Sequence, residues 1–418
     1  MRLDRLSFIQ AAEIIKTFDS PVFVIDEAAF RDSIRGFVRR FQVPRHPVEV
    51  AYSYKTNNVL AVCAIARDEG LSAEVVTEHE LSLADSLGIP GEKIIYNGPQ
   101  KSEASLIRAM ELGAHIHIDS FEEADKIAKL AHASRPARVG IRLTSNIGEM
   151  PWDKFGFDVP SGEADRVCRL ICNASNVRLS GLHMHIGTNI TSIDSYRQAL
   201  RTLTGFATHL HSEFGIDLDY LDIGGGFSSP AGGVPTVVHP EEWLPIDLSA
   251  CGRAISEELD NAGIPENVAI VTEPGRALVE TVAYLLTRVL HAKVRGDRKL
   301  VVIDCGCNFL PTAYYTKHTV VAIGQETSEG NLEMVDIHGP LCTQYDLVAP
   351  AALVPPLKSG DILAVKAVGA YALAFSCQFV SPRPAVVLHL AEDGSYECVR
   401  KAETTADMWR NDIVPSRL

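Results

Sequence analysis

The sequence predicts an α/β fold in which a (β/α)8 TIM-like barrel is followed by a mostly antiparallel β domain, and three observations support this prediction. Short apolar runs alternate with segments of helical periodicity over the first two thirds of the chain. These runs number eight, which is the number of strands in such a barrel. Beyond about residue 280 the pattern changes to alternating Val and Ile residues with little helical periodicity, which is typical of antiparallel strands.

The eight runs that we expect to form the barrel strands are rich in apolar residues. They are residues 48–55, 73–77, 93–97, 115–119, 138–143, 179–186, 218–223 and 269–272. The segments between them, such as residues 78–84 and 102–112, have apolar residues at helical spacing. Each is long enough for the right-handed crossover that joins parallel strands.

The remainder of the chain is predicted to form a second domain built mainly of strands. Turn signals at residues 295–297, 358–361 and 392–394 separate its apolar runs. One further run, residues 20–26, precedes the barrel, and we expect it to pair into the same second domain. The expected boundaries are therefore 27–279 for the barrel, and 1–26 together with 280–418 for the β domain.

The composition indicates a globular protein and argues against several classes of partner. With 39 basic and 53 acidic residues the formal net charge is −14, and the lack of a basic run argues against binding to nucleic acid or an anionic membrane. Nine cysteines without a Cys-x-x-Cys pair suit reduced thiols. Because residues 1–5 lead into an amphipathic segment and no stretch is long enough to span a bilayer, we expect a cytoplasmic protein.

In a barrel of this kind the functional groups gather at the carboxyl ends of the strands. Lys55 closes the first expected strand. A lysine there is usually a solvated charge, and less often an amine held in a pocket for covalent chemistry. The groups after the later strands favour the second interpretation, because a lysine that carries pyridoxal phosphate needs them. They are His183 and His185 in the last part of the sixth strand, Gly224, Gly225 and Gly226 after the seventh, and Glu273, Gly275 and Arg276 after the eighth.

The three consecutive glycines are candidates for a phosphate cradle. Glycines leave backbone N–H groups unobstructed, and barrels often hold phosphate with the loops after strands seven and eight. A glycine triplet on its own is more simply a flexible turn. Its position beside Glu273 and Arg276 favours the cradle.

The two histidines admit a rival interpretation. His183 and His185 alternate in the expected strand, so both would point to one face, and such a pair can ligate a metal with Glu273 or Asp222 as a third ligand. A metal-dependent barrel hydrolase is therefore the alternative function from another class. A third alternative is a protein that keeps the fold without catalytic activity. A metal leaves Lys55 and the glycines unexplained, whereas a flat cofactor ring stacked on His185 explains them. We therefore predict no metal site, with a structural core histidine as the alternative role for His183.

Seven motifs in order now show a resemblance that covers nearly the whole chain. The chain resembles the fold-type III, alanine-racemase-like decarboxylases that use pyridoxal phosphate, the group of diaminopimelate, ornithine and arginine decarboxylases. The motifs are Tyr52-Ser53-Tyr54-Lys55-Thr56-Asn57, Lys154-Phe155-Gly156, His183-Met184-His185-Ile186-Gly187, Gly224-Gly225-Gly226-Phe227, Glu273-Pro274-Gly275-Arg276, Gly339-Pro340-Leu341-Cys342 with Asp346, and Gly369-Ala370-Tyr371.

The resemblance implies a role for each of these groups. It implies a Schiff base on Lys55, a ring stacked on His185, and Glu273 against the pyridine nitrogen. It also implies a homodimer in which Cys342 and Asp346 of one subunit complete the site of the other. The further cofactor-binding residues that it implies are Thr188, Gly225, Gly226, Gly275, Arg276 and Tyr371.

The residue facing the ring nitrogen indicates the reaction class. A carboxylate such as Glu273 favours a protonated pyridine, which accepts the electron pair left when carbon dioxide departs, through a quinonoid intermediate. An arginine in that place would favour racemisation. We therefore expect decarboxylation, with Cys342 as the donor of the replacing proton. Most free cysteines are buried apolar thiols, and only the motif around Cys342 favours the catalytic role.

Two positions depart from the family where its members read the far end of the substrate. The relatives carry an acidic residue directly after the motif cysteine, and here that residue is Thr343. The run 307–315, which ends in Tyr315, contains proline but lacks the arginine that holds a distal carboxylate. We therefore expect Thr343, Asp346 and Tyr315 to contact a substrate whose far end is neutral, bulky or conjugated, free or carrier-bound, as in specialised-metabolite or siderophore pathways. The alternative is a free diamino acid of the diaminopimelate, ornithine or lysine type, since Asp346 could still receive a cationic group.

Overall fold

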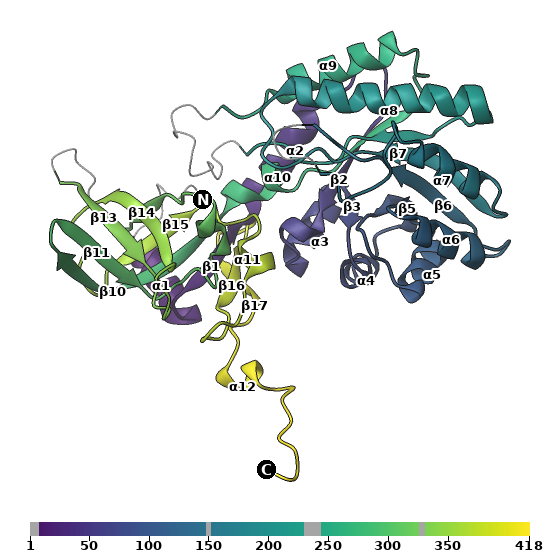
Figure 1. The fold of residues 1–418 in the computed structure, drawn as a ribbon. Coiled ribbons are helices and arrows are strands. Elements are labelled where there is room, and N and C mark those ends of the chain that lie inside the picture. Colours follow the sequence, from purple (N-terminus) through teal and green to yellow (C-terminus); the bar gives the residue numbers. More distant parts are fainter. Residues whose placement is uncertain (1–7, 148–151, 230–243, 326–330) are drawn as a thin grey trace. The chain divides into compact units, whose positions relative to one another are not determined.

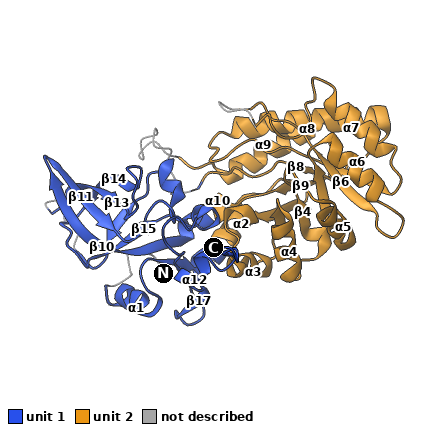
Figure 2. Cartoon of the chain, turned by 60° about the horizontal axis from the view of Figure 1, so that its bottom comes forward, with its two compact units in different colours: residues 1–32, 229–243, 279–418 blue, residues 33–228, 244–278 orange. Residues whose placement is uncertain are grey.

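The computed structural model describes residues 8–147, 152–229, 244–325 and 331–418 (Figure 1). Residues 1–5, which were used in the expectation of a cytoplasmic protein, lie outside these ranges. The chain divides into two compact units (Figure 2). The barrel unit takes in the described residues of 33–228 and 244–278, and the β unit those of 1–32, 229–243 and 279–418. Among the described residues no helix has both the length and the apolar character needed to cross a membrane.

The barrel unit contains a closed ring of eight parallel strands, which confirms the predicted (β/α)8 architecture. The strands are β2 Val48–Ser53, β3 Ser72–Val75, β4 Ile94–Tyr96, β5 His115–Ile118, β6 Ala137–Arg142, β7 Val177–His183, β8 Tyr220–Asp222 and β9 Ala269–Thr272. Pairing of β2 with β9 closes the ring, with Val48 opposite Ile270. Seven of the eight strands end one to three residues before their predicted ends. Two of these differences move predicted site residues out of a strand: β2 ends at Ser53, so that Lys55 lies in the 3-10 turn η2 Tyr54–Thr56, and β7 ends at His183, before His185.

Helices follow the strands and lie outside the ring, as Figure 1 shows. They are α2 Glu27–Arg40 before β2, and then α3 Leu60–Asp68, α4 Glu78–Ser86, α5 Glu103–Leu112, α6 Phe121–Leu130, α7 Glu163–Cys172, α8 Ile193–Phe214, α9 Leu248–Asn261 and the short α10 Arg276–Val279. Side-chain caps start several of them. The hydroxyl groups of Thr77, Ser102 and Ser120 accept backbone N–H groups in the first turns of α4, α5 and α6. Gly113 and Gly215, both left-handed, end α5 and α8.

The β unit is built on one nine-stranded sheet, most of whose pairs are antiparallel. Its strands are β1 Val22–Asp26, β10 Ala283–Arg295, β11 Arg298–Ile303, β12 Val320–Ala322, β13 Glu333–His338, β14 Leu347–Val354, β15 Ile362–Lys366, β16 Ala385–His389 and β17 Tyr396–Arg400. β1, from the N-terminal segment, pairs with β10 and with β16. α1 Phe8–Phe18 packs on this sheet through Ala11, Ile14 and Ile15. The short helices α11 Ala372–Phe375 and α12 Thr405–Met408 complete the unit.

Candidate active site

Lys55 lies beside a buried carboxylate at the carboxyl end of the barrel strands. Its Nζ is 2.5 Å from Oε2 of Glu74, which belongs to β3. Glu74 is fully buried, whereas the side chain of Lys55 is 35% exposed. The other oxygen of Glu74, Oε1, accepts a hydrogen bond from Nδ2 of Asn97 at 3.1 Å. A lysine in this position is held by a counter-charge and is still open to a ligand.

Glu273 follows β9 and lies deep in the barrel, where it is 3% exposed. Nδ2 of Asn97 donates to its Oε1 at 2.6 Å, and Nε2 of His183 lies 3.6 Å from its Oε2. Burial alone would raise the pKa of Glu273, but the charge of Lys55 and the neighbouring Asp222 outweigh it and lower that pKa. The pKa of Asp222 is raised well above its usual range by burial and by Glu273. The negative charge of this pair therefore belongs on Glu273, and the proton on Asp222.

His183 stacks on His117, a contact that the sequence analysis did not predict. The rings of His117 and His183 stack at 4.8 Å with an interplanar angle of 18°. Burial lowers the pKa of both well below the usual value, so both are neutral at neutral pH. The prediction that His183 and His185 alternate within one strand is wrong, because β7 ends at His183.

The structure brings together a different set of possible metal ligands from the one considered in the sequence. Possible ligand atoms of His117, His183, Asp222 and Glu273 lie within 4.8 Å of one another, and His185 does not belong to this group among the described residues. Both nitrogens of His117 are already engaged: Nδ1 lies 2.6 Å from Oδ1 of Asn97, and Nε2 lies 2.8 Å from the hydroxyl of Tyr220. A hydrogen-bonded histidine of this kind is a poor metal ligand.

His185 lies next to the glycine loop. Its Nδ1 accepts the backbone N–H of Gly225 at 3.2 Å, and the ring of Trp152 meets it edge-on at 4.9 Å. Burial, together with the positive charges of Lys55 and Arg142, lowers the pKa of His185 to about 3. The imidazole is therefore an uncharged flat surface, which is what stacking on a cofactor ring requires.

The glycine loop is packed so closely that side chains would not fit. A Cβ on Gly225 would lie 2.3 Å from the backbone oxygen of Glu273, and a Cβ on Gly226 would lie 2.6 Å from that of Gly187. Gly226 also has a φ of +87°, which favours glycine. The hydroxyl of Tyr196 donates to the Gly225 oxygen at 3.0 Å and steadies the loop.

Gly275 and Arg276 continue the same end of the barrel. A Cβ on Gly275 would lie 2.0 Å from Oγ1 of Thr56, so the loop after β9 approaches the turn that holds Lys55. Arg276 begins α10 and is 8% exposed. Thr188 is exposed in the segment after β7. An amine, a buried carboxylate, a glycine cradle and an arginine on one face of the barrel fit the aldehyde, ring nitrogen and phosphate of pyridoxal phosphate.

The remaining predicted site residues belong to the β unit. Cys342 is exposed and Tyr371, with a φ of +63°, precedes α11. Asp346 is buried, and its two oxygens accept the backbone N–H groups of Cys307 and Leu341, each at 2.7 Å. Its carboxylate therefore links the loop that contains Cys307 to the loop that contains Leu341 and Cys342.

The other two predicted substrate contacts also lie in the β unit. The hydroxyl of Thr343 accepts the backbone N–H of Tyr345 at 3.3 Å, within the loop that Asp346 steadies. Tyr315 directly follows the 3-10 turn η6 Pro311–Tyr314 and is 44% exposed. The contacts of Cys342, Asp346, Thr343, Tyr315 and Tyr371 with a substrate or with the cofactor therefore stay predictions.

Three residues that contact the predicted groups were not predicted from the sequence. Glu74 pairs with Lys55, Asn97 bridges two carboxylates, and His117 stacks on His183. The signal that could have found Asn97 is its place at the carboxyl end of the expected strand 93–97. Glu74 and His117 stand within expected strands as polar residues in apolar runs, which is also informative.

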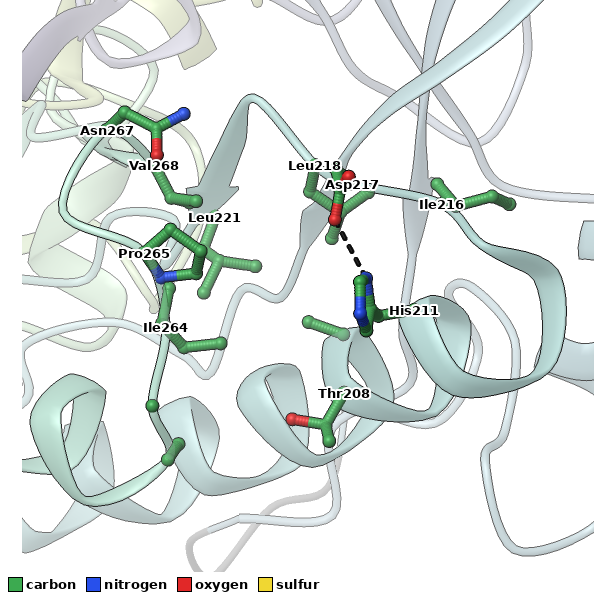
Figure 3. A pocket seen from close by; sticks show the side chains of 13 residues that line it. Thr208, His211, Ile216, Asp217, Leu218, Leu221, Ile264, Pro265, Asn267 and Val268 are labelled. Atoms are coloured by element: carbon green, nitrogen blue, oxygen red, sulfur yellow. Dashed lines mark hydrogen bonds and ion pairs between the residues drawn. The ribbon is translucent and has the colours of Figure 1, made fainter.

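A pocket on the same unit opens at the opposite end of the strands (Figure 3). Its lining includes Leu218 and Val268, which precede β8 and β9, and the exposed ion pair of His211 with Asp217 at 2.8 Å. None of the predicted site residues lines it. Because barrel enzymes act at the carboxyl ends of the strands, this pocket is not the candidate active site.

Comparisons with known proteins show which family the chain resembles over most of its length. Residues 30–280 match the family model described as pyridoxal-dependent decarboxylase, pyridoxal binding domain. Diaminopimelate decarboxylase from Methanothermobacter thermautotrophicus is 31% identical, over 98% of this chain and 95% of its own. The crystal structure of diaminopimelate decarboxylase from M. jannaschii with L-lysine is similar at a TM-score of 0.89 and 28% identity, over 98% of this chain and 95% of that one. L-glutamyl-[BtrI acyl-carrier protein] decarboxylase from Niallia circulans is 27% identical, over 98% and 96% of the two chains.

Proposed function

This chain belongs to the pyridoxal-dependent decarboxylases, and we propose that it removes the α-carboxylate of a free diamino acid of the diaminopimelate or lysine type. The enzyme class is a carboxy-lyase that depends on pyridoxal phosphate. The main support for the substrate is the full-length likeness to diaminopimelate decarboxylases. This likeness favours a free diamino acid over the neutral or conjugated substrate that Thr343 suggested, and it favours the cofactor over the metal-dependent hydrolase.

The proposed roles follow from the contacts of each residue. Pyridoxal phosphate, when bound, supplies an aldehyde for the substrate amine and a ring that accepts the electron pair left by carbon dioxide. Lys55 would hold the cofactor through its aldehyde carbon, and Glu74 at 2.5 Å can take or return the proton of the Lys55 amine. Glu273 stays ionised and keeps a proton on the ring nitrogen. The neutral imidazole of His185 would cover one face of the ring.

The remaining roles concern the phosphate and the replacing proton. Gly225, Gly226 and Gly275 would bring backbone close to the phosphate, and Arg276 would supply the positive charge, with Thr188 and Tyr371 as further contacts. We propose that Cys342 donates the proton to the α-carbon and that it does so across a homodimer interface. The exposed position of Cys342 in the β unit is consistent with a residue that serves a second copy.

A second candidate substrate is supported by specific residues. Threonine at position 343 cannot pair with a distal ammonium at full strength, and the run 307–315 has no arginine for a distal carboxylate. The likeness to a decarboxylase named for a carrier-bound glutamyl group points the same way. An amino acid with a neutral or carrier-linked far end is therefore the competing substrate.

Carbon dioxide release from matched substrates tests the proposal. The purified enzyme, loaded with pyridoxal phosphate, is given meso-diaminopimelate, lysine or ornithine, and separately a glutamyl thioester of a carrier protein. We expect a kcat/KM of about 10⁴ M⁻¹s⁻¹ or more for one free diamino acid, and product mass confirms loss of the α-carboxylate. Lys55→Ala serves as the inactive control. Turnover of the thioester together with none of the free diamino acids would reverse the choice of substrate.

A further inference from the structure

The side chain of Asn97 lies between two carboxylates of the barrel site. Asn97 directly follows β4 and is 3% exposed. Its Nδ2 donates to Oε1 of Glu74 at 3.1 Å and to Oε1 of Glu273 at 2.6 Å. Glu74 is the partner of Lys55, and Glu273 is the carboxylate proposed to face the cofactor ring. One amide group thus joins the groups that control the lysine nitrogen and the ring nitrogen.

The orientation of this amide follows from the charges around it. An amide oxygen facing Glu74 and Glu273 would repel both, so the nitrogen must face them. The amide oxygen then faces Nδ1 of His117 at 2.6 Å and can only accept, so the imidazole proton lies on Nδ1. The other nitrogen, Nε2, accepts the hydroxyl proton of Tyr220 at 2.8 Å.

Packing holds the two rings behind Asn97 in place. A Cβ on Gly140 would lie 2.5 Å from the His117 ring, and a Cβ on Gly181 would lie 2.2 Å from the Tyr220 ring, so both rings occupy room that glycine leaves. Burial lowers the pKa of His117 and raises that of Tyr220, so neither group changes its proton count near neutral pH. The hydrogen bonds therefore run in one direction, from Tyr220 through His117 and Asn97 to the carboxylates.

We propose that Asn97 is a positioning residue that keeps Glu273 ionised and thereby keeps the ring nitrogen of bound pyridoxal phosphate protonated. Hydrogen bonds to a carboxylate stabilise its charged form, and two carboxylates bridged by one donor group repel each other less than two bare ones. Without the amide, Glu273 loses this hydrogen bond and takes up a proton, and the ring loses its counter-charge. The inference rests on the proposed role of Glu273 and is independent of the substrate.

The test measures the protonation of the ring itself. Full-length Asn97→Leu, which keeps the volume, and Asn97→Ala are loaded with pyridoxal phosphate that carries 15N in the ring. We expect the 15N chemical shift of the wild type to be that of a protonated pyridine, and that of both variants to move toward the unprotonated value. We also expect kcat to fall by about 10- to 100-fold with a smaller change in KM.

Tyr96→Phe is the matched control. The hydroxyl of the buried Tyr96, next to Asn97 in the chain, donates to Ser105 on α5 at 3.0 Å. Its loss removes a buried hydrogen bond outside the carboxylate network, so we expect the ring shift and the absorption spectrum of the wild type. Asn97 variants with a wild-type ring shift and only a lower melting temperature would overturn the inference.

Two further outcomes distinguish a failure of the proposed function from a failure of the inference about Asn97. A wild type that binds the cofactor without an imine band would contradict the role of Lys55 in the proposed function, and not the role of Asn97. If neither Asn97 variant folds, 15N spectra of histidine in the wild type decide the matter. They should show His117 protonated at Nδ1, and a proton on Nε2 would rule out the amide orientation that the inference requires.

Discussion

At the scale of single residues, the contact of Lys55 with Glu74 makes a prediction about turnover. Glu74→Gln keeps the shape of the side chain but cannot accept the lysine proton. We therefore expect kcat to fall by about 100-fold while the cofactor still binds. Steady-state carbon dioxide release and the absorbance of the bound cofactor measure the two effects. Glu78→Gln, at an exposed position in the first turn of α4, is the control. A fully active Glu74→Gln would show that the proton goes elsewhere.

His115 predicts how stability depends on pH. It begins β5, and burial, with the charge of Arg138, lowers its pKa to about 4 from the usual 6.5. In the unfolded chain His115 has its usual pKa of 6.5, so as the pH falls it is protonated at a higher pH than in the folded protein. The free energy of unfolding therefore decreases as the pH falls from 6.5 to about 4. His115→Gln should make the decrease in the free energy of unfolding between pH 7.5 and 4.5 smaller by on the order of 2 kcal/mol, as measured by denaturant unfolding. The exposed His79→Gln should leave the decrease unchanged; an equal effect of both variants would contradict the prediction.

The site residues that the sequence predicts are those for which position along a strand is sufficient. Gly225 and Glu273 follow expected strands, and His185 lies near the end of one. The barrel architecture brings the carboxyl ends of its strands together. Glu74 and His117 lie within strands. A parallel strand covered on both sides has no clear alternation, so the side of the barrel to which they point cannot be inferred from one sequence.

At the scale of elements, the loop after β8 makes a prediction about binding. Gly225→Ala places a Cβ 2.3 Å from the Glu273 backbone oxygen, so the loop must move. We expect a loss of about 1–3 kcal/mol of stability and weaker binding of pyridoxal phosphate, measured by thermal unfolding and by fluorescence titration. Gly205→Ala on α8, whose Cβ would meet no atom within 4 Å, should instead stabilise the protein slightly. Unchanged cofactor affinity in Gly225→Ala would contradict the proposed cradle.

The error at β7 also belongs to this scale. The prediction continued the strand to residue 186 because the residues after His183 are compatible with a strand. In the structure β7 pairs with β8 up to His183 opposite Asp222, where β8 itself ends. The end of β8 coincides with the glycine loop, where Gly224 has a φ of +66°. Strand length here is set by the neighbouring strand, and one sequence segment alone does not contain that information.

At the scale of the whole molecule, the proposed catalytic groups are divided between two units. Lys55 and Glu273 belong to the barrel unit, and Cys342 belongs to the β unit. The proposed homodimer would supply Cys342 to a site from a second copy. This arrangement implies that a single subunit cannot complete the reaction, and mixing experiments can test it.

Lys55→Ala and Cys342→Ala should each have strongly reduced activity as pure proteins. When the two are mixed, unfolded partially and allowed to reassociate, a hybrid dimer has one site with both mutated residues and one with neither. Random reassortment makes half of the dimers hybrids, so about a quarter of the wild-type activity should return. Size measurement must show dimers, and co-purification of two differently tagged variants must show that hybrids form. Hybrids without recovered activity would mean that each subunit uses its own Cys342.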